Sequence, residues 1–261
     1  STLLPYTTLF RSNADRNVRM TYCLGLLLDG GIVFASDSRT HASVDNHSRF
    51  CKMTVFERPG DRVVVLLSSG ALAATQSIIS VLKQRAELND GTPSVYNART
   101  MFDVAEVVSD ATRYVERREA AGGHTSSLVF NASFIFGGQI QGEQPRIFRT
   151  YAETNFIEAE RESPYLQTGE TKYGKPILDR VITFTTSLSD GAKCALLSFD
   201  STMRSNLSVG LPIDLLSYER DSLRVTQRRR FEDGDAQFSQ LTRAWSAGVR
   251  DLFTRLPEPS W

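Results

Sequence analysis

The sequence predicts an α+β protein in which two β-sheets pack face to face, with helices covering both outer faces. Three observations support this four-layer αββα sandwich. Strand-like and helix-like segments fall in separate runs, in the order strands, helix pair, strands, helix pair, strands, helix. No Pro-rich or Gly-rich linker and no repeat divides the 261 residues. Hydrophobic residues make up 41% of the chain, which is enough for a sizeable core.

The chain after Met20 begins with strands that are joined by tight turns. Four strands are expected here, at 21–28, 32–37, 50–57 and 62–69. Asp29-Gly30-Gly31 supplies the positive-φ positions of a type I′ hairpin, and Pro59-Gly60-Asp61 marks a second turn. Residues 38–48 are polar and are expected to form a loop. We therefore expect a four-stranded antiparallel unit.

Helices and further strands follow. The helical segments carry apolar residues at helical spacing, as at Leu72, Ile79 and Leu82. Helices are expected at 71–88, 102–120, 173–182, 190–203 and from a cap at Asp233 or Asp235 through Leu256. Strands are expected at 126–136, 145–151, 155–160, 165–168, 211–218 and 223–230. Gly122-Gly123 would stop the second helix, and residues 137–144 would connect two strands.

Composition and charge exclude several classes of function. Lys plus Arg number 30, as do Asp plus Glu, so no net field attracts nucleic acid or an anionic membrane. No apolar run reaches the ~18 residues of a membrane helix. The three cysteines lack CxxC spacing and the three histidines lack an HExxH pattern, so we expect neither a disulfide framework nor a zinc site. The cysteine usage favours a reducing, cytoplasmic location, and we expect no cofactor.

Residues 1–20 do not fit the periodic pattern of the rest of the chain. They include Leu3-Leu4 and Leu9-Phe10, but no h-region long enough for a signal peptide and no small-residue cleavage site. Three explanations fit these residues: a propeptide, a wrongly assigned start, or sequence added in cloning. We favour the last two. We expect residues 1–20 to be a non-native or removed extension and 21–261 to form one domain.

Thr21 is the first candidate for a catalytic residue, because a threonine that follows a methionine can become N-terminal. A free N-terminal threonine carries its own base, since its α-amine titrates near pH ~8 and can take the hydroxyl proton. Thr21 starts one strand of the hairpin and Asp37 ends the other, so both are expected at one end of the sheet. Lys52 starts the next strand and can reach the same end. Its ammonium would favour the deprotonated hydroxyl, while Asp37 would orient that ammonium.

These residues also have a purely structural explanation. A threonine at a strand end is a good β-former. An Asp–Lys pair at a sheet edge is usually a surface ion pair worth ~0–1 kcal/mol. Spacing alone leaves the choice open between a catalytic cluster and an ordinary sheet edge.

Longer tracts resemble a known family. Residues 21–53, followed by 63–70, resemble the start of a proteasome β-subunit, which is an N-terminal-nucleophile hydrolase. Residues 21–40, TYCLGLLLDGGIVFASDSRT, resemble more specifically the Anbu type, the ancestral β-subunit of bacterial proteasome homologues. The tracts KMTVFERPGD at 52–61 and YLQTGETKYGKPILDR at 165–180 fit the same group. The resemblance extends from the first strand to about residue 250.

The resemblance implies the αββα fold, Thr21 as the nucleophile, and Asp37 and Lys52 as its partners. It also implies assembly into rings or open helical oligomers, for which the helices between 71 and 120 would be the packing faces. The substrate would be a peptide or an unfolded protein segment. The sequence indicates neither an ATPase partner, nor a ring size, nor a side-chain preference.

Two tracts depart from the family's pattern. Proteasome β-subunits place a Gly-Ser-Gly tract near the site, and here it reads Gly169-Glu170-Thr171, with Glu170 in place of the serine. They also use an Asp-x-x-Ser-Gly-like tract, in which Ser208 here fits the serine while Ser205 replaces the acid. An anion beside the N-terminal amine would raise the amine's pKa. Both changes bear on peptidase efficiency and not on the fold.

Gly70 is a further candidate for the site. The resemblance implies that its backbone N–H donates to the oxyanion, and a glycine in a strand-to-helix turn explains the residue equally well. Cys23, two residues after the threonine, is expected to be a buried structural thiol. His41 and His47 are expected to be solvated, and Arg228-Arg229-Arg230 to form a solvated face or an interface.

The sequence therefore predicts a threonine-type peptidase that uses Thr21 once residues 1–20 are gone. The hydroxyl would attack a peptide carbonyl, with the amine acting as base and then as acid, and water would release the ester intermediate. One alternative is a catalytically weak or inactive oligomeric scaffold on the same fold, which Glu170 and Ser205 favour. Another is a small-molecule amidase with the same nucleophile.

Overall fold

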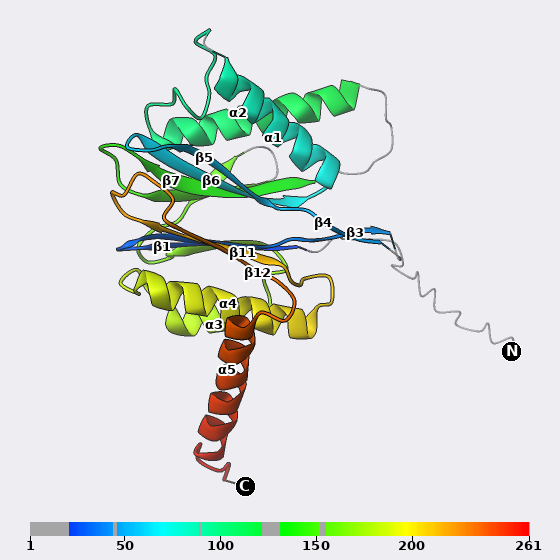
Figure 1. Cartoon of the computed structure of the whole chain (residues 1–261), viewed down its shortest axis with the longest axis vertical. Helices are drawn as coiled ribbons and strands as arrows, with labels where there is room; N and C mark the ends of the chain where they lie inside the picture. Colours follow the sequence, from blue (N-terminus) through cyan, green and yellow to red (C-terminus); the bar gives the residue numbers. More distant parts are fainter. Residues whose placement is uncertain (1–20, 44–45, 89, 122–130, 152–154, 261) are drawn as a thin grey trace, which may run out of the picture.

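Two five-stranded sheets pack face to face, and helices cover the outer face of each (Figure 1). The structure, a computed structural model, describes residues 21–260 except 44–45, 89, 122–130 and 152–154, and for 40–49 it describes the backbone alone. Helices α1 and α2 lie over one sheet and α3 and α4 over the other, while α5 projects away from the sandwich. The helices are α1 Leu72–Glu87, α2 Met101–Ala121, α3 Lys175–Val181, α4 Leu188–Ser205 and α5 Ala236–Thr254. The predicted four-layer αββα sandwich is confirmed.

All strand pairs in both sheets are antiparallel. The first sheet has the order β10-β1-β2-β11-β12, with strands Tyr165–Gly169, Tyr22–Leu28, Gly31–Asp37, Ile213–Glu219 and Gln227–Phe231. The second has the order β5-β6-β7-β8-β9, with strands Met53–Arg58, Arg62–Gly70, Ala132–Ile140, Arg146–Thr150 and Phe156–Glu158. The predicted hairpin after Leu28 joins β1 to β2, in a register that pairs Cys23 with Ser36.

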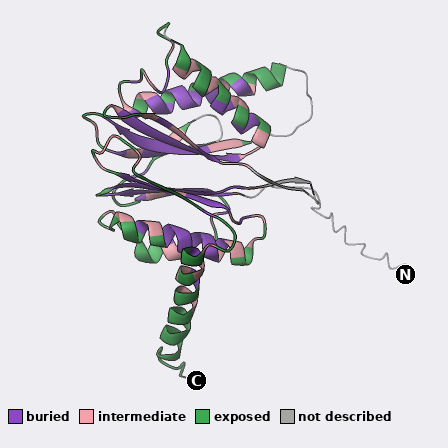
Figure 2. Cartoon of the chain, in the orientation of Figure 1, coloured by how far each residue is buried: buried purple, intermediate pink, exposed green. Residues whose placement is uncertain are grey.

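The core lies in three layers because both faces of each sheet are covered. Every residue of β1 and β2 is buried, which explains their continuous apolar runs. The layer between the sheets contains Phe34, Leu67 and Ile135. The other two layers lie under α1–α2 and under α3–α4, so buried residues follow both sheets and the inner sides of these helices (Figure 2). Among the described helices, none is both long and apolar enough to cross a bilayer.

The expected four-stranded N-terminal unit is wrong. Strands β1 and β2 belong to one sheet and β5 and β6 to the other, so the chain crosses between the sheets after Asp37. The expected loop at 38–48 contains a two-stranded ribbon of β3 Arg39–Ser43 and β4 Asn46–Arg49. Its sequence is polar apart from one alanine and gives no alternating pattern, so sequence analysis could not detect it.

Two further boundaries differ from expectation. Strand β7 continues through Gly137, where the expectation was a connection, because a Cβ at Gly137 would lie 2.4 Å from the carbonyl oxygen of Arg146. This glycine therefore allows close pairing of β7 with β8. Strand β12 begins at Gln227, four residues later than expected, because Asp221 and Leu223 adopt positive φ values. The predicted stop at 122–123 lies outside the described residues.

The closing helix begins where a side-chain cap was expected. Of the two predicted caps, Asp235 is the one used, and its side chain accepts a hydrogen bond of 2.9 Å from the backbone N–H of Phe238. Helix α5 then runs to Thr254 and leaves the sandwich after its first turns, with only Phe238 and Thr242 buried. Most of α5 therefore has no packing partner among the described residues of its own chain (Figure 2).

Candidate active site

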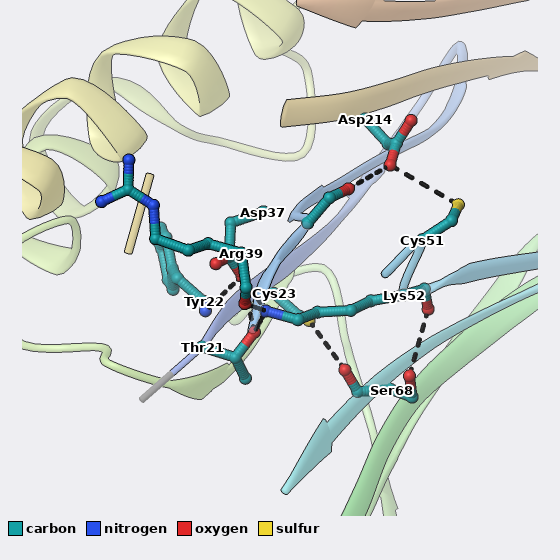
Figure 3. Close-up of polar contacts among 10 residues, drawn as sticks. Thr21, Tyr22, Cys23, Asp37, Arg39, Cys51, Lys52, Ser68 and Asp214 are labelled. Carbon is teal, nitrogen blue, oxygen red and sulfur yellow. Dashed lines mark hydrogen bonds and ion pairs between the residues drawn. The ribbon is translucent and has the colours of Figure 1, made fainter. Parts of the chain in front are cut away.

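Thr21, Asp37 and Lys52 meet at one end of the two sheets (Figure 3). Thr21 immediately precedes β1, and Asp37 is the last residue of the neighbouring β2. The Thr21 hydroxyl donates to Asp37 Oδ1 over 2.5 Å, and Lys52 Nζ donates to the same hydroxyl. Lys52 Nζ also lies 2.6 Å from Asp37 Oδ1. Lys52 precedes β5 of the opposite sheet, so the cluster depends on how the two sheets pack and not on a single hairpin.

The environment of Lys52 suits a buried ammonium. An ammonium has three N–H donors, and Lys52 finds three acceptors in Thr21 Oγ1, Asp37 Oδ1 and the carbonyl oxygen of Arg39, the last at 2.9 Å. The side chains of Lys52 and Asp37 are 7% and 0% exposed. This burial rules out the surface ion pair that was the structural alternative, because a surface pair would have solvent-exposed side chains.

Asp37 has a second role at this end of the sheet. Its Oδ1 accepts a further hydrogen bond, of 3.1 Å, from the backbone N–H of Tyr22, which fixes the carboxylate against the start of β1. Its Oδ2 is buried and has no hydrogen-bond partner within the part of the chain that the structure describes. The arrangement places the Thr21 hydroxyl between a cation and a carboxylate, which is an environment suited to proton transfer from that hydroxyl.

Glu170 lies beside Thr21, and a residue that sequence analysis missed holds it. The backbone N–H of Glu170, just after β10, donates to the Thr21 carbonyl over 2.7 Å. The Glu170 side chain is buried, and its Oε2 accepts a 2.9 Å hydrogen bond from Asn206 Nδ2. Asn206 Oδ1 in turn accepts from the backbone N–H of Ser208, also over 2.9 Å. Ser208 is thus connected to the site through Asn206, while Ser205 is exposed at the end of α4.

Asn206 could have been found from one signal. It lies inside the tract Ser205–Gly210, where only the positions of an acid and a serine were considered. An asparagine at a helix C-cap offers both a donor and an acceptor, and Asn206 is the C-cap of α4. The carboxylate that the family pattern places in this tract is absent, and the buried carboxylate of Glu170 lies opposite the asparagine instead.

Gly70 ends β6 in a conformation that requires glycine. Its φ is +107°, and a Cβ there would lie 2.2 Å from the carbonyl oxygen of Asn131. The next residue, Ala71, donates its N–H to the same carbonyl over 2.7 Å before α1 begins. The strand-to-helix turn therefore accounts for the glycine without a catalytic role, and donation to an oxyanion stays a prediction.

No family model and no curated protein matches the chain. Several solved structures are similar to the chain in both sequence and fold. Anbu from Hyphomicrobium sp. strain MC1 is 47% identical, with 92% of this chain and 100% of that chain covered and a TM-score of 0.84. Anbu, the ancestral β-subunit, from Yersinia bercovieri is 42% identical over 92% and 99% of the two chains, with a TM-score of 0.86.

The chain belongs to the Anbu family. A third relative, solved as a helical assembly of the Anbu complex from Pseudomonas aeruginosa, is 46% identical over 92% of this chain and 98% of that one, with a TM-score of 0.85. The resemblance drawn from the sequence is therefore confirmed, as is the proteasome-like N-terminal-nucleophile fold.

Cys23 is a buried thiol next to the site of this Anbu family member. Its Sγ lies 3.5 Å from the carbonyl oxygen of Ser68, and none of the residue is exposed. Burial raises its pKa to about 12. A thiol of this kind is protonated near neutral pH and is a weak nucleophile, so its geometry fits a structural role.

The remaining candidates are three arginines and two histidines. The side chains of Arg228, Arg229 and Arg230 are exposed on the edge strand β12, as expected of a solvated face or interface. The side chains of His41 and His47 lie outside the described residues. Among the residues that are described, no three His, Cys, Asp or Glu side chains are grouped in a way that could hold a metal ion.

Proposed function

We propose that this Anbu family member is a threonine-type peptidase, with Thr21 Oγ1 as its nucleophile. The observation that carries the proposal is the buried cluster in which the Thr21 hydroxyl contacts both the Lys52 ammonium and the Asp37 carboxylate. The wider N-terminal-nucleophile hydrolase family supports the same chemistry. The substrate would be a peptide or an unfolded protein segment, and the cysteine usage supports a cytoplasmic location.

The reaction begins with the free α-amine of Thr21. The amine takes the proton of Oγ1 as Oγ1 attacks the substrate carbonyl, and the Lys52 ammonium and the Gly70 N–H offset the charge that develops. The protonated amine then gives its proton to the leaving nitrogen, so the C–N bond breaks and an ester to Thr21 remains. Water attacks this ester with the amine again as base, which restores Oγ1–H and releases the carboxyl product.

The proposal requires that the bond between Met20 and Thr21 is broken. While that bond is intact, the Thr21 nitrogen is an amide and cannot act as a base. Thr21 Oγ1 could attack the Met20 carbonyl and release residues 1–20, or an aminopeptidase could remove Met20 if translation starts there. We therefore propose that the mature domain is 21–261.

The test combines mass spectrometry with a covalent probe. Intact mass of the protein purified from its native source should correspond to a chain that begins at Thr21. A peptide β-lactone, which acylates nucleophilic hydroxyls, should add one mass increment to that chain and to Thr21→Ser, and none to Thr21→Ala. A chain that retains residues before Thr21, or equal labelling of Thr21→Ala, would contradict the peptidase proposal. Comparison of short amides with peptide reporters then separates a small-molecule amidase from a peptidase.

Self-association is the second function that a specific observation favours. Along the last turns of α5 and just after its end, four large apolar residues are 46–74% exposed and follow helical spacing: Val249, Leu252, Phe253 and Leu256. The Pseudomonas aeruginosa relative forms a helical assembly of the Anbu complex. We propose that this side of α5 packs against a second copy of the chain, and that α5 is a stronger packing surface than the helices between 71 and 120.

Light scattering after size exclusion tests the α5 surface. The variant Leu252→Ser/Phe253→Ser should lower the oligomer mass. Arg243→Ser is the matched control, because Arg243 lies half a turn around the helix from Leu252 and should leave the mass unchanged. An unchanged mass for the double variant would exclude α5 as the packing surface. If Thr21→Ala assembles normally and is labelled by the β-lactone as strongly as the parent, the scaffold function is favoured over catalysis.

A further inference from the structure

A second buried polar cluster adjoins the Thr21 site, and it involves the sequence neighbours of Asp37 and Lys52. Asp214 Oδ2 accepts a 2.7 Å hydrogen bond from the hydroxyl of Ser38, the residue after Asp37. The same oxygen lies 3.5 Å from the Sγ of Cys51, the residue before Lys52. Figure 3 shows Asp214 and Cys51 in contact, with the Lys52 side chain extending toward Thr21.

The register of β11 explains why a carboxylate lies there. Asp214 pairs with Ser36 of β2. Alternate residues of a strand lie on the same face, so Asp214 shares one face of β11 with Leu216 and Tyr218. Those two side chains belong to the core between the sheets. Asp214 is therefore at the end of that core, where the chain passes from one sheet to the other, and it is 3% exposed. Arg230 Nη1, at 3.6 Å from Oδ1, provides a nearby positive charge.

Backbone hydrogen bonds tie the same two segments together. The N–H of Ser38 donates to the carbonyl of Pro212 over 2.8 Å, and the N–H of Phe50 donates to the carbonyl of Ser38 over 2.9 Å. The loop that leaves β2 is thus held to the residue before β11, and the segment that enters β5 is held to that loop. Consecutive Cα atoms are joined by a planar trans peptide at a fixed distance of about 3.8 Å. A shift of Ser38 would therefore move Asp37, and a shift of Cys51 would move Lys52.

We propose that Asp214 is a positioning residue, whose carboxylate holds Ser38 and Cys51 and thereby fixes the spacing of Asp37 and Lys52 around Thr21. Asp214 does not touch the reacting hydroxyl itself. The effect on reaction rate rests on the proposed peptidase function, whereas the effect on Lys52 does not. A misplacement of ~1 Å in a catalytic group can lower a rate ~100-fold, so the position of Lys52 has kinetic consequences.

Lysine side-chain NMR of the full chain measures the position of Lys52 directly. The chain has five lysines, and Lys52 is the buried one, whereas Lys83, Lys172, Lys175 and Lys193 are exposed. Because its ammonium has three protein acceptors, its ¹⁵N–¹H signal should be protected from exchange with water and should disappear in Lys52→Arg. The absence of any such protected signal in the parent would overturn the proposal, since Lys52 would not be held.

The test variant is Asp214→Asn, which keeps the shape of the side chain and removes its charge. We expect the Lys52 signal to shift and broaden in this variant. The matched control is Asp200→Asn, because Asp200 is also buried but pairs with Arg204 within α4. The Lys52 signal should be unchanged in the control. An unchanged Lys52 signal in folded Asp214→Asn would overturn the proposal.

A second variant covers the case in which Asp214→Asn does not fold. Ser38→Ala/Cys51→Ala removes both side-chain donors and keeps the carboxylate, so it should perturb the Lys52 signal in the same way. The variant Ser38→Ala/Cys51→Ser has a hydroxyl donor toward Asp214 in place of the thiol. Its Lys52 signal should return to that of the parent. Failure of the double variant to perturb Lys52 would exclude the positioning role.

The kinetic consequence is measured with the β-lactone on protein that begins at Thr21. The rate of the bond-forming step should fall ~10–100-fold in Asp214→Asn, while the half-saturating concentration of the probe changes less than about twofold. A purely destabilising substitution would not produce this split in folded protein, and Asp200→Asn should show neither change. If the parent is not acylated at all, the peptidase proposal is contradicted, and the Lys52 signal still decides the role of Asp214.

Discussion

Replacing Lys52 by methionine tests whether the buried pair is as sensitive as its environment implies. Methionine retains most of the side-chain volume and loses the charge. The Asp37 carboxylate, which is 0% exposed, would then keep only the Thr21 hydroxyl and the Tyr22 N–H as partners on Oδ1, and Oδ2 would still have none among the described residues. Removing one partner of a buried ion pair costs ~3–5 kcal/mol, because the remaining charge is uncompensated.

A matched control is present in the same chain. Lys175 and Asp179 form an ion pair at 2.8 Å, close to the 2.6 Å of the buried pair, but their side chains are 54% and 48% exposed. Lys175→Met should therefore cost only ~0–1 kcal/mol. The two substitutions are chemically identical, so a difference in their effect on unfolding isolates the contribution of burial.

Urea and thermal unfolding followed by circular dichroism provide the measurement. For a domain of this size, ~3–5 kcal/mol corresponds to a fall in Tm of ~6–20 °C for Lys52→Met, against at most ~4 °C for Lys175→Met. Asp37→Asn/Lys52→Met should recover part of the loss because no buried charge remains. Equal losses for the two lysine variants would refute the reasoning.

Three further outcomes follow from the geometry. With its pKa raised to about 12, Cys23 has a thiolate fraction of ~10⁻⁴ at pH 8, so an aromatic disulfide should modify it only after unfolding, whereas half-buried Cys51 should react in the native protein. Because the folded thiol of Cys23 binds its proton more tightly than the unfolded one, its contribution to stability should be lost as pH rises from ~9 to 12. Gly169→Ala should lower the free energy of unfolding by ~1–3 kcal/mol and slow Thr21 acylation, because a Cβ there would lie 1.9 Å from the Thr21 carbonyl oxygen. The control is Gly60→Ala, since Gly60 has a similar φ and open space around it. This control should show only the smaller cost of the backbone conformation.

The sequence was sufficient for the fold class and for most elements. Apolar residues at helical spacing located α1 and α2 within one residue at each end, and the continuous apolar run after Met20 located β1. These signals are local, because periodicity reflects which face of one element is buried. The polar ribbon of β3 and β4 has no buried face pattern, and it was missed for that reason.

The proximity of Thr21 to Asp37 was also a local inference. A short turn after Leu28 sets the register of one hairpin, and that register places the start of β1 beside the end of β2. Lys52 was expected from the third strand of the same sheet and comes instead from the opposite sheet. Its ammonium reaches the same hydroxyl only because the two sheets pack with these ends together.

The sequence by itself therefore determined the αββα class, the hairpin that presents Thr21, and the residue types of the proposed nucleophile and its two proposed partners. Only the tertiary structure decided which sheet supplies Lys52, that Asn206 holds Glu170, and that Asp214 joins Ser38 to Cys51. Turns and periodicity are fixed by neighbours within a few residues, and they can be recognised in the sequence. Contacts between residues more than thirty positions apart depend on the packing of whole layers, and that packing is the sum of many weak contacts that no single motif encodes.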